Sequence, residues 1–433
     1  SGEAFTFADA EKLIDYFAQL GVSHLYLSPI LTAGEGSSHG YDVTDPTTVS
    51  AELGGADGFR RLTEAARAAG LGIIVDIVPN HVGVDVPRQN RWWWDVLTHG
   101  RQSAYSSYFD IDWDMDADGR IILPVLGSDD DAAELVVASR TDSDGNGEKW
   151  LRLGDLEYPI SPDTGGDAGA AGSQIHDRQH YKLIGWRNGS CGYRRFFSIT
   201  SLAGLRQEDR AVFEATHAEV GRWFAEHLVD GIRIDHPDGL SDPGSYLAWL
   251  RELTGPDAWI VIEKILAVDE PLDPSLPVAG TTGYDALREI GGLFVDPTGV
   301  EALTGLVESA GPDYSTTSEV ARRLKVQAVT TTLASELGRL CRAVVAATGR
   351  DHERLPEAVA ELLSHVGVYR SDYLTLTSVL PVAISETAAA QGELAEPLAL
   401  LTAALSTRAE VGARLEQLYG PATAKAMEDC LFY

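Results

Sequence analysis

The sequence predicts an α/β fold built on parallel strands, and two observations lead to this prediction. Short, almost entirely apolar segments are typical of buried strands; they are residues 24–28, 72–78, 231–235 and 259–263. Segments with helical periodicity lie before and between them; they are residues 8–20, 58–69, 207–228 and 244–253. Strands without a polar face need cover on both sides of their sheet, and alternating helices in βαβ units provide that cover.

The first elements follow from local signals. The apolar positions of residues 8–20 fall on one helix face, and Gly21 follows as a stop signal. These positions are Leu13, Ile14, Phe17 and Leu20. Asp57 is a candidate N-cap for the helix 58–69, which Gly70 ends. The segment GIIVDIV at 72–78 then indicates a fully buried strand.

The alternation resumes after residue 200. The helix 207–228 precedes the strand GIRID, and the helix 244–253 precedes the strand WIVIE. The segment 276–280 is a candidate for one more strand. Beyond residue 285 the chain is predicted to be helical, with a long helical stretch at 318–348 that is rich in Ala, Leu, Arg and Val and contains no Pro.

The stretch 82–200 differs from its surroundings. Turn signals at Asp118-Gly119 and Asp144-Gly145 flank short strand candidates at 121–126 and 134–139, which predicts small hairpins. The composition of 163–173 is typical of a flexible loop. We therefore expect an insertion in the fold. The expected parts are a first barrel-like part at 1–81, an inserted subdomain at 82–200, a second barrel-like part at 201–285 and a helical subdomain at 286–433.

Length and charge restrict the class of protein. A chain of 433 residues fits one large α/β barrel with insertions or two to three domains. The net charge of −31 argues against nucleic acid and anionic membrane surfaces as partners, and no apolar run is long enough to span a membrane. The start of the chain has no signal-peptide pattern. Three distant cysteines, Cys191, Cys341 and Cys430, fit a reducing compartment, so we expect a cytoplasmic protein.

Polar residues gather where the predicted strands end. After each strand in turn the chain presents candidate site residues, which are His39, Tyr41 and Asp42, then Asp76, Asn80 and His81, then Arg233, Asp235 and His236, and then Glu263. The carboxyl ends of parallel strands meet at one edge of a sheet or barrel, where functional sites are built. Packing alone does not explain four strands that end this way.

Structural alternatives remain for several of these residues. Arg233 and Asp235 are two apart in a strand and face the same side, so they form either a structural ion pair or the rim of a site. Asp76 is also consistent with a brace for its loop, and Asn80 with a residue that holds the loop. Three consecutive tryptophans, Trp92 to Trp94, fit either a core or a surface that stacks on sugar rings.

Two carboxylates in different environments are what glycosidic bond chemistry requires. One stays ionised and attacks the anomeric carbon, while the other protonates the leaving oxygen. In retaining enzymes the two groups lie only about 5 Å apart, which residues on adjacent strand ends can satisfy. Asp235 and Glu263 are the candidates for this pair.

The segments DIVPNH (76–81), GIRIDHPDG (231–239) and VIEK (261–264) resemble conserved regions of the α-amylase superfamily. Within it, four further segments resemble the maltooligosyltrehalose synthases; they are HGYDVTDP, YKLIGWRNG, RRFFSITSLAGLR and VAGTTGYD. The resemblance implies a (β/α)8 TIM barrel with an inserted B-type subdomain. It also implies that Asp235 is the nucleophile, that Glu263 is the acid/base and that Arg233 orients Asp235.

The resemblance further implies a reaction and a substrate. Tyr41, His81 and Asp76, with His39 and His236, would bind a maltooligosaccharide whose terminal α-1,4 bond becomes an α,α-1,1 bond. Residues of the insertion would hold the released glucose and exclude water; the candidates are Tyr181, Lys182, Trp186 and Arg187. The open alternatives are a hydrolase or 4-α-glucanotransferase, and an inactive fragment or binding module.

The sequence departs from the family pattern in three ways. The first barrel strand would precede residue 1, and no His-Asp that could supply a third carboxylate follows Glu263. Pro237 and Asp238 stand where many members have Lys-His. Asn80 occupies a position where some amylases bind calcium, but no companion carboxylates are evident, so we predict no metal and no cofactor. We therefore expect a chain without the first and last barrel strands, whose partner is the rest of the same polypeptide.

Overall fold

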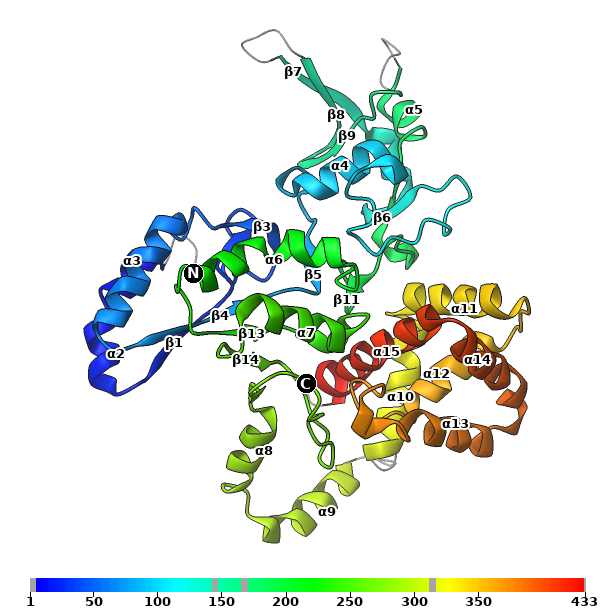
Figure 1. The fold of residues 1–433 in the computed structure, drawn as a ribbon. Helices are drawn as coiled ribbons and strands as arrows, with labels where there is room; N and C mark the ends of the chain where they lie inside the picture. Colours follow the sequence, from blue (N-terminus) through cyan, green and yellow to red (C-terminus); the bar gives the residue numbers. More distant parts are fainter. Residues whose placement is uncertain (1–4, 142–146, 165–169, 311–316, 432–433) are drawn as a thin grey trace. The chain divides into compact units, whose positions relative to one another are not determined.

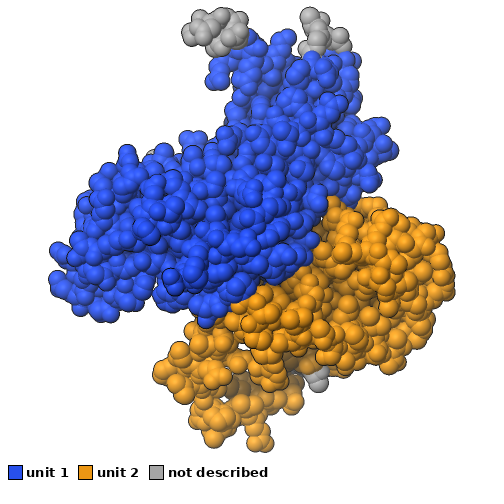
Figure 2. Space-filling model, in the orientation of Figure 1, with its two compact units in different colours: residues 1–262, 277–279 blue, residues 263–276, 280–433 orange. Residues whose placement is uncertain are grey.

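The computed structural model describes residues 5–141, 147–164, 170–310 and 317–431. The chain divides into two compact units (Figure 2). Unit 1 comprises residues 1–262 and 277–279, and unit 2 comprises residues 263–276 and 280–433. The finer four-part division at 81, 200 and 285 stays a prediction.

Unit 1 is built on a parallel sheet (Figure 1). Its neighbouring strands, in spatial order, are β1 (His24–Leu27), β4 (Gly72–Ile77), β13 (Gly231–Ile234) and β14 (Trp259–Ile262). The connecting helices are α3 (Gly55–Ala68), α6 (Arg210–Ala225) and α7 (Pro243–Thr254). The predicted parallel βαβ arrangement is confirmed. Among the described residues no pairing joins β1 to β14, so these strands form an open arc.

The ends of these helices follow from capping residues. Asp209 accepts a hydrogen bond from the Ala211 amide at the start of α6, and Asp242 accepts one from the Ser245 amide at the start of α7. Helix α3 begins at Gly55, so the prediction that Asp57 is its N-cap is wrong; Asp57 lies in the first turn, where its charge suits the helix dipole.

The predicted helix 8–20 is two helices, α1 (Phe7–Glu11) and α2 (Ile14–Leu20). Phe7 packs on Phe59 of α3 with ring centroids 5.5 Å apart, and Ile14 is the one buried residue of α2. Lys12 and Leu13 form a turn that separates the two helices. Tyr16 and Leu20 on α2 are exposed.

A hairpin that the sequence did not predict follows β1. Strands β2 (Leu31–Ala33) and β3 (Val43–Val49) pair antiparallel and hold the loop that contains His39 and Tyr41. The Thr44 hydroxyl donates to the carbonyl of Ala33 at 3.1 Å, which closes the base of this loop.

The segment between β4 and α6 forms the inserted part of unit 1. Its strands fall into three groups, namely β5 (His81–Gly83) with β12 (Ile199–Gly204) and β11 (Arg195–Phe196), β6 (Ile121–Leu126) with β10 (Tyr181–Gly185), and β7 (Val136–Thr141) with β8 (Gly147–Leu153) and β9 (Leu156–Pro159). Its α-helices are α4 (Arg91–His99) and α5 (Gly172–His176).

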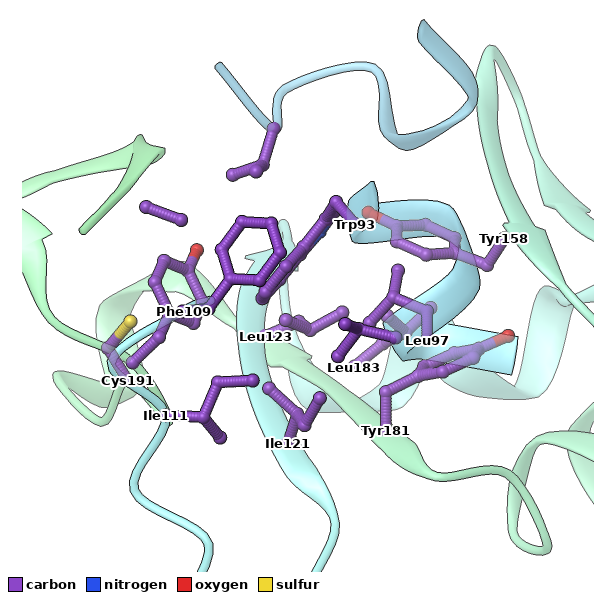
Figure 3. Close-up of a cluster of buried hydrophobic side chains, with 14 of the residues drawn as sticks. Trp93, Leu97, Phe109, Ile111, Ile121, Leu123, Tyr158, Tyr181, Leu183 and Cys191 are labelled. Carbon is purple, nitrogen blue, oxygen red and sulfur yellow. The ribbon is translucent and has the colours of Figure 1, made fainter. Parts of the chain in front are cut away.

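Trp93 lies at the centre of the core of this inserted part, as Figure 3 shows. Its ring packs against Phe109 at 4.9 Å and against Tyr193 at 5.3 Å between centroids. Trp92 is buried as well and packs against Tyr105 and Tyr108. The structural interpretation of these two tryptophans is confirmed.

Of the two hairpins predicted in this part, the structure contradicts the one at Asp118-Gly119, while the turn of the other lies outside the described residues. Strands β7 and β8 pair antiparallel, while the turn at Asp144-Gly145 lies outside the described residues. The prediction for Asp118-Gly119 is wrong. Gly119 closes a local turn on Asp116, but β6 then pairs parallel with the distant β10. The predicted loop 163–173 includes 165–169, which lie outside the described residues, and its last two residues begin α5.

Unit 2 is helical in its described residues, apart from β15 (Gly280–Thr281). Its α-helices are α8 (Tyr284–Gly292), α9 (Val300–Ala310), α10 (Thr317–Thr330), α11 (Ala334–Thr348), α12 (Leu355–Ser364), α13 (Val379–Ala390), α14 (Ala395–Thr407) and α15 (Ala409–Thr423), and the π-helix η10 (Ala424–Leu431) follows. The predicted helical character after residue 285 is confirmed. The strand predicted at 276–280 is wrong in extent, because only Gly280 belongs to a strand.

The predicted long helix at 318–348 is interrupted between α10 and α11. Three consecutive threonines follow Val329, and the hydroxyls of Thr330 and Thr331 donate to the carbonyls four residues earlier. Such back-bonding favours a bend or an end in a helix. No helix in the described ranges is long and apolar enough to cross a membrane.

A buried histidine joins two helices of unit 1. His217 on α6 donates from Nδ1 to the Phe213 carbonyl and accepts from the Tyr246 hydroxyl of α7 at 2.9 Å. Burial lowers the pKa of His217 to about 4. In the unfolded chain the imidazole binds a proton near pH 6.5, so the folded state loses stability as the pH falls from 6.5 toward 4.

We predict that His217→Gln flattens this pH dependence. Between pH 7 and pH 5 the unfolding free energy of the unchanged chain should fall by about 2 kcal/mol more than that of the variant, since one pKa unit corresponds to about 1.4 kcal/mol. Urea unfolding at both pH values measures the difference. His39→Gln, which removes an exposed imidazole, is the control and should leave the slope unchanged. An equal fall of the unfolding free energy between pH 7 and pH 5 in the unchanged chain and in His217→Gln would contradict the prediction.

Candidate active site

One guanidinium group organises the carboxyl ends of β4 and β13. Arg233 is the register partner of Asp76 in the parallel ladder, and its Nη1 lies 3.0 and 2.9 Å from the two carboxylate oxygens of Asp76. The same nitrogen donates to Asp235 Oδ1 at 2.8 Å. All three residues are buried. Arg233 therefore joins two carboxylates on neighbouring strands, and the sequence interpretation of Arg233–Asp235 as a pair is incomplete without Asp76.

Two tyrosines complete the environment of Asp76. The hydroxyls of Tyr26 on β1 and Tyr41 in the β2–β3 loop each donate to Asp76 Oδ2 at 2.6 Å. Burial raises the pKa of Asp76, while Arg233 and the two hydroxyls act in the opposite direction. Burial and the bond to Asp76 raise the pKa of both tyrosines far above 10, so they remain hydrogen-bond donors.

His81 begins β5 and is fully buried beside this network. Its Nε2 donates to the Tyr41 carbonyl at 3.2 Å, and its Nδ1 faces the Asn80 amide at 3.5 Å. Burial, followed by the nearby His236 and Arg194, lowers the pKa of His81 to about 3. The imidazole is therefore neutral near pH 7, and its bond to the Tyr41 carbonyl fixes the tautomer that donates from Nε2.

His236 follows Asp235 in a left-handed conformation that is unusual for a residue with a side chain, with φ of 44°. Its ring packs against Phe196 at 5.2 Å and Phe197 at 5.0 Å. Phe196 also packs on His81 at 4.4 Å. A pair of phenylalanines from the inserted part thus contacts both histidines of the site.

Asp235 and Glu263 follow register partners on adjacent parallel strands, because Ile234 pairs with Ile262. Both isoleucines are fully buried, so the two carboxylates begin where the sheet ends. Within unit 2, Glu263 is partly exposed and accepts a hydrogen bond from the Tyr284 hydroxyl at 3.3 Å.

Of the other predicted residues, His39 lies at the edge of this network, next to Tyr41, and Lys182 and Trp186 lie on or near β10. His39 is exposed, and its Nδ1 accepts from the Tyr41 amide at 3.0 Å. Lys182 lies on β10. Trp186 follows β10 with 57% of its surface exposed, and the Arg187 guanidinium stacks over it at 4.4 Å. No described contact links Lys182 or Trp186 to Asp76, Arg233 or Asp235.

Tyr181 does not fit the role of a substrate-binding residue that the sequence suggested. It is fully buried, its hydroxyl donates to the Pro159 carbonyl at 2.8 Å, and it packs against Tyr158. Tyr181 and Leu183 of β10 both belong to the hydrophobic core drawn in Figure 3, so Tyr181 is a core residue.

Sequence reasoning missed several residues of the site. Tyr26 lies inside the predicted strand HLYLS and was not among the predicted site residues. A tyrosine in a short strand next to a polar loop is the pattern that could have indicated its role. Arg194, Phe196 and Phe197 belong to the motif RRFFSITSLAGLR, and Tyr284 belongs to VAGTTGYD. These motifs by themselves predict no role for the individual residues. Their contacts cross more than 20 residues of sequence, which local patterns do not reveal.

The described side chains do not gather into a metal-binding cluster of three or more His, Cys, Asp or Glu. Asn80, at the position where the resemblance placed calcium in some amylases, accepts a hydrogen bond from Arg194 at 2.6 Å through Oδ1. A guanidinium thus contacts the amide oxygen that a cation would use.

Comparison with known proteins agrees with this geometry. The family model of the alpha amylase catalytic domain matches residues 10–247, more than half of the chain. A Mycobacterium tuberculosis (strain H37Rv) protein with the name "Putative maltooligosyl trehalose synthase" is 63% identical over 433 residues, which are 100% of this chain and 55% of that protein.

Solved structures are similar over the same extent. The maltooligosyltrehalose synthase from Arthrobacter ramosus has a TM-score of 0.90 and 42% identity, covering 100% of this chain and 55% of that one. A hypothetical maltooligosyl trehalose synthase of Sulfolobus tokodaii has a TM-score of 0.82 and 32% identity, covering 99% and 54%. The chain thus spans about half the length of these relatives. Because the family model matches more than half of its residues, the chain belongs to the family of the α-amylase catalytic domain.

Proposed function

We propose that this chain provides the catalytic carboxylates of an intramolecular transglycosylase, which converts the terminal α-1,4 bond at the reducing end of a maltooligosaccharide into an α,α-1,1 bond. The observation that carries the proposal is the placement of Asp235 and Glu263 directly after the paired residues Ile234 and Ile262. The likeness to maltooligosyl trehalose synthases over the whole chain supports the choice of reaction.

In the first step Asp235 is the nucleophile. Its carboxylate forms a bond to the anomeric carbon of the penultimate glucose, while the bond from that carbon to the bridging oxygen breaks. Glu263 gives its proton to that oxygen, which becomes the 4-hydroxyl of the released glucose. The Arg233 guanidinium at 2.8 Å favours the ionised form of Asp235 that this attack requires.

In the second step the released glucose must turn rather than leave. Its anomeric hydroxyl attacks the glycosyl-enzyme carbon, Glu263 takes the hydroxyl proton, and the bond to Asp235 breaks. Two inversions at the same carbon retain its α configuration. Water is the competing nucleophile, so residues that hold the glucose decide between isomerisation and hydrolysis.

The substrate-binding residues on the other side of the bond are proposed to be Tyr41, His81, Asp76, Arg233 and His236, with His39 at the rim. The neutral His81 and the donor hydroxyl of Tyr41 suit sugar hydroxyls, which both donate and accept. Lys182 and Trp186 remain the proposed contacts of the released glucose, as a cation and an exposed indole that can face a sugar ring.

The proposed partner is the rest of a longer polypeptide. Unit 2 exposes an apolar face on α8, α9 and the turn between them, hereafter the α8–α9 face. Its exposed side chains are Leu287, Ile290, Leu293, Phe294, Val295, Val300, Leu303, Leu306 and Val307. Leu293 and Phe294 are 81% and 87% exposed. A face of this kind is normally covered by another surface. Since the relatives are nearly twice as long as this chain, we propose that the additional segment covers it.

We also propose a reducing compartment, the cytoplasm, for this protein. Cys191, Cys341 and Cys430 are not joined by disulfide bonds in the described part of the chain. Cys191 is buried in the core of the inserted part, where a reduced cysteine packs as a small apolar residue.

We predict that the longer polypeptide converts maltopentaose into a product that has no reducing end but still contains five glucose units. Asp235→Asn should lower the rate by at least about 10³-fold, because no carboxylate then attacks. Asp269→Asn, at an exposed position in the loop after Glu263, is the control and should be active. New reducing ends from shorter chains would indicate a hydrolase, and products both longer and shorter would indicate a 4-α-glucanotransferase. Either result overturns the proposal.

We predict that Lys182→Ala and Trp186→Ala each increase the ratio of hydrolysis to isomerisation several-fold, because the released glucose escapes before it turns. The ratio of free glucose to non-reducing product measures this effect. Lys149→Ala, at an exposed position on β8 of the same inserted part, should leave the ratio unchanged. Unchanged ratios in both variants would remove these residues from the proposal.

We predict that the α8–α9 face binds the additional segment when the two are produced as separate polypeptides. Leu293→Asp combined with Phe294→Asp should weaken this association by at least about 10-fold, because two desolvated charges would face an apolar partner. Val268→Asp, at an exposed position elsewhere in unit 2, is the matched control. Undiminished binding of the double variant would contradict the prediction, as would a dimer of chain 1–433 held through this face.

A further inference from the structure

Arg194 is a buried cation surrounded by oxygen atoms. It lies just before β11, 8% exposed, and its guanidinium reaches acceptors from four segments of unit 1. Nη1 donates to Asn80 Oδ1 at 2.6 Å and to the Gly239 carbonyl at 3.4 Å, and Nη2 donates to the carbonyls of Leu205 at 2.7 Å and Asn80 at 3.3 Å. Nε donates to Asp110 Oδ2 at 3.2 Å.

The backbone is shaped to admit this group. A Cβ on Gly204 would lie 2.5 Å from the guanidinium carbon of Arg194, so only glycine fits beside it. The Arg194 amide donates to the Asp110 carbonyl, and its carbonyl accepts from the Gly204 amide. Side chain and backbone of Arg194 are thus held by the same segments, which is typical of a built cation site and not of a chance surface pair.

The acceptors belong to segments that carry the candidate site. Asn80 follows β4 and precedes His81, and Gly239 ends the turn that begins at His236. On the other side, Arg194 is two and three residues from Phe196 and Phe197, which pack on His81 and His236. One guanidinium therefore joins the inserted part to both loops next to Asp235.

Four carbonyl or amide oxygens and one carboxylate oxygen are also the ligands that a hard cation such as Ca²⁺ prefers. A guanidinium meets the same need with directional N–H bonds and without exchange with solvent. If its side chain is cut back, the oxygens remain without donors, which is costly in a buried place.

We propose that Arg194 is the built-in structural cation of this site and a positioning residue for His81 and His236. We further propose that its oxygen cage is a cation-binding site, which accepts a small guanidinium compound or Ca²⁺ when the side chain is removed. The catalytic part of this inference rests on the proposed function, whereas the binding part does not.

The test is Arg194→Ala in the longer polypeptide, with Arg195→Ala as the matched control. Arg195 is adjacent and basic, but it is only partly buried and its Nη1 donates to the local Ser198 carbonyl. Arg194→Ala should lower kcat by at least about 30-fold with KM changed by less than about 3-fold, since a displaced site loses transition-state contacts first. Methylguanidinium or CaCl₂ at millimolar concentration should raise the kcat of Arg194→Ala at least about 10-fold above its value without the additive. NaCl at equal ionic strength should not raise it.

Thermal unfolding separates the two parts of the inference. Methylguanidinium or CaCl₂ should raise the Tm of Arg194→Ala by at least about 2 °C and leave the Tm of Arg195→Ala unchanged, whatever reaction the protein catalyses. Failure of both cations to raise the Tm or to restore kcat overturns the inference. If the product assay fails while the Tm rises, the proposed function is at fault and the cation site stands.

A second variant keeps the test decisive if Arg194→Ala does not fold. Arg194→Lys retains one charge but loses the fork of donors, so it should fold, show an intermediate kcat and gain less than Arg194→Ala from added methylguanidinium. Gly204→Ala forces the guanidinium from its place without removing its charge and should lower kcat to a similar degree. Full activity of both variants would overturn the role of Arg194.

Discussion

The register between β4 and β13 is the constraint on which the candidate site depends. Arg233 lies directly opposite Asp76 in the ladder, and Asp235 is two residues further on the same face. A slip of one residue would turn Arg233 and Asp235 together to the other face of the sheet, away from Asp76, and would leave the buried Asp76 carboxylate without its cation, a cost of several kcal/mol. Because Tyr26 and Tyr41 also donate to Asp76, the strand β1 and the β2–β3 loop are fixed by the same carboxylate.

The repeating part of this design could be predicted from sequence, since apolar strands and helical periodicity are local signals. The positions of Asp76, Arg233, Asp235 and Glu263 at strand ends follow from the same signals. The contacts that complete the site could not, because Arg194 meets Asn80 across 114 residues of sequence. Local patterns also misjudged the helix at 8–20, which a turn at Lys12 and Leu13 interrupts, and the partner of β6, which is the distant β10.

The backbone around Glu263 is held on both sides while its side chain stays accessible. Ile262 before it is fully buried in the sheet, and Lys264 after it is buried in an ion pair with Glu270 at 2.8 Å. Glu270 also accepts from the Ala267 amide, which closes the loop after β14. The acid/base role proposed for Glu263 would need this combination, because the position of the carboxyl group must be fixed while its proton is exchanged with the reacting oxygen.

The loops after β4 and β13 pack closely against each other at Gly239, where there is no room for a side chain. A Cβ on Gly239 would lie 2.4 Å from the His236 ring and 3.0 Å from Asn80 Oδ1, so a larger residue would separate the two loops. The left-handed backbone of His236 costs free energy that its neighbours must offset. The rings of Phe196 and Phe197 and the bonds of Arg194 to Asn80 and Gly239 supply that offset. The geometry next to Asp235 is therefore determined in part from outside the parallel sheet, because the inserted part contributes Arg194, Phe196 and Phe197 to the candidate site.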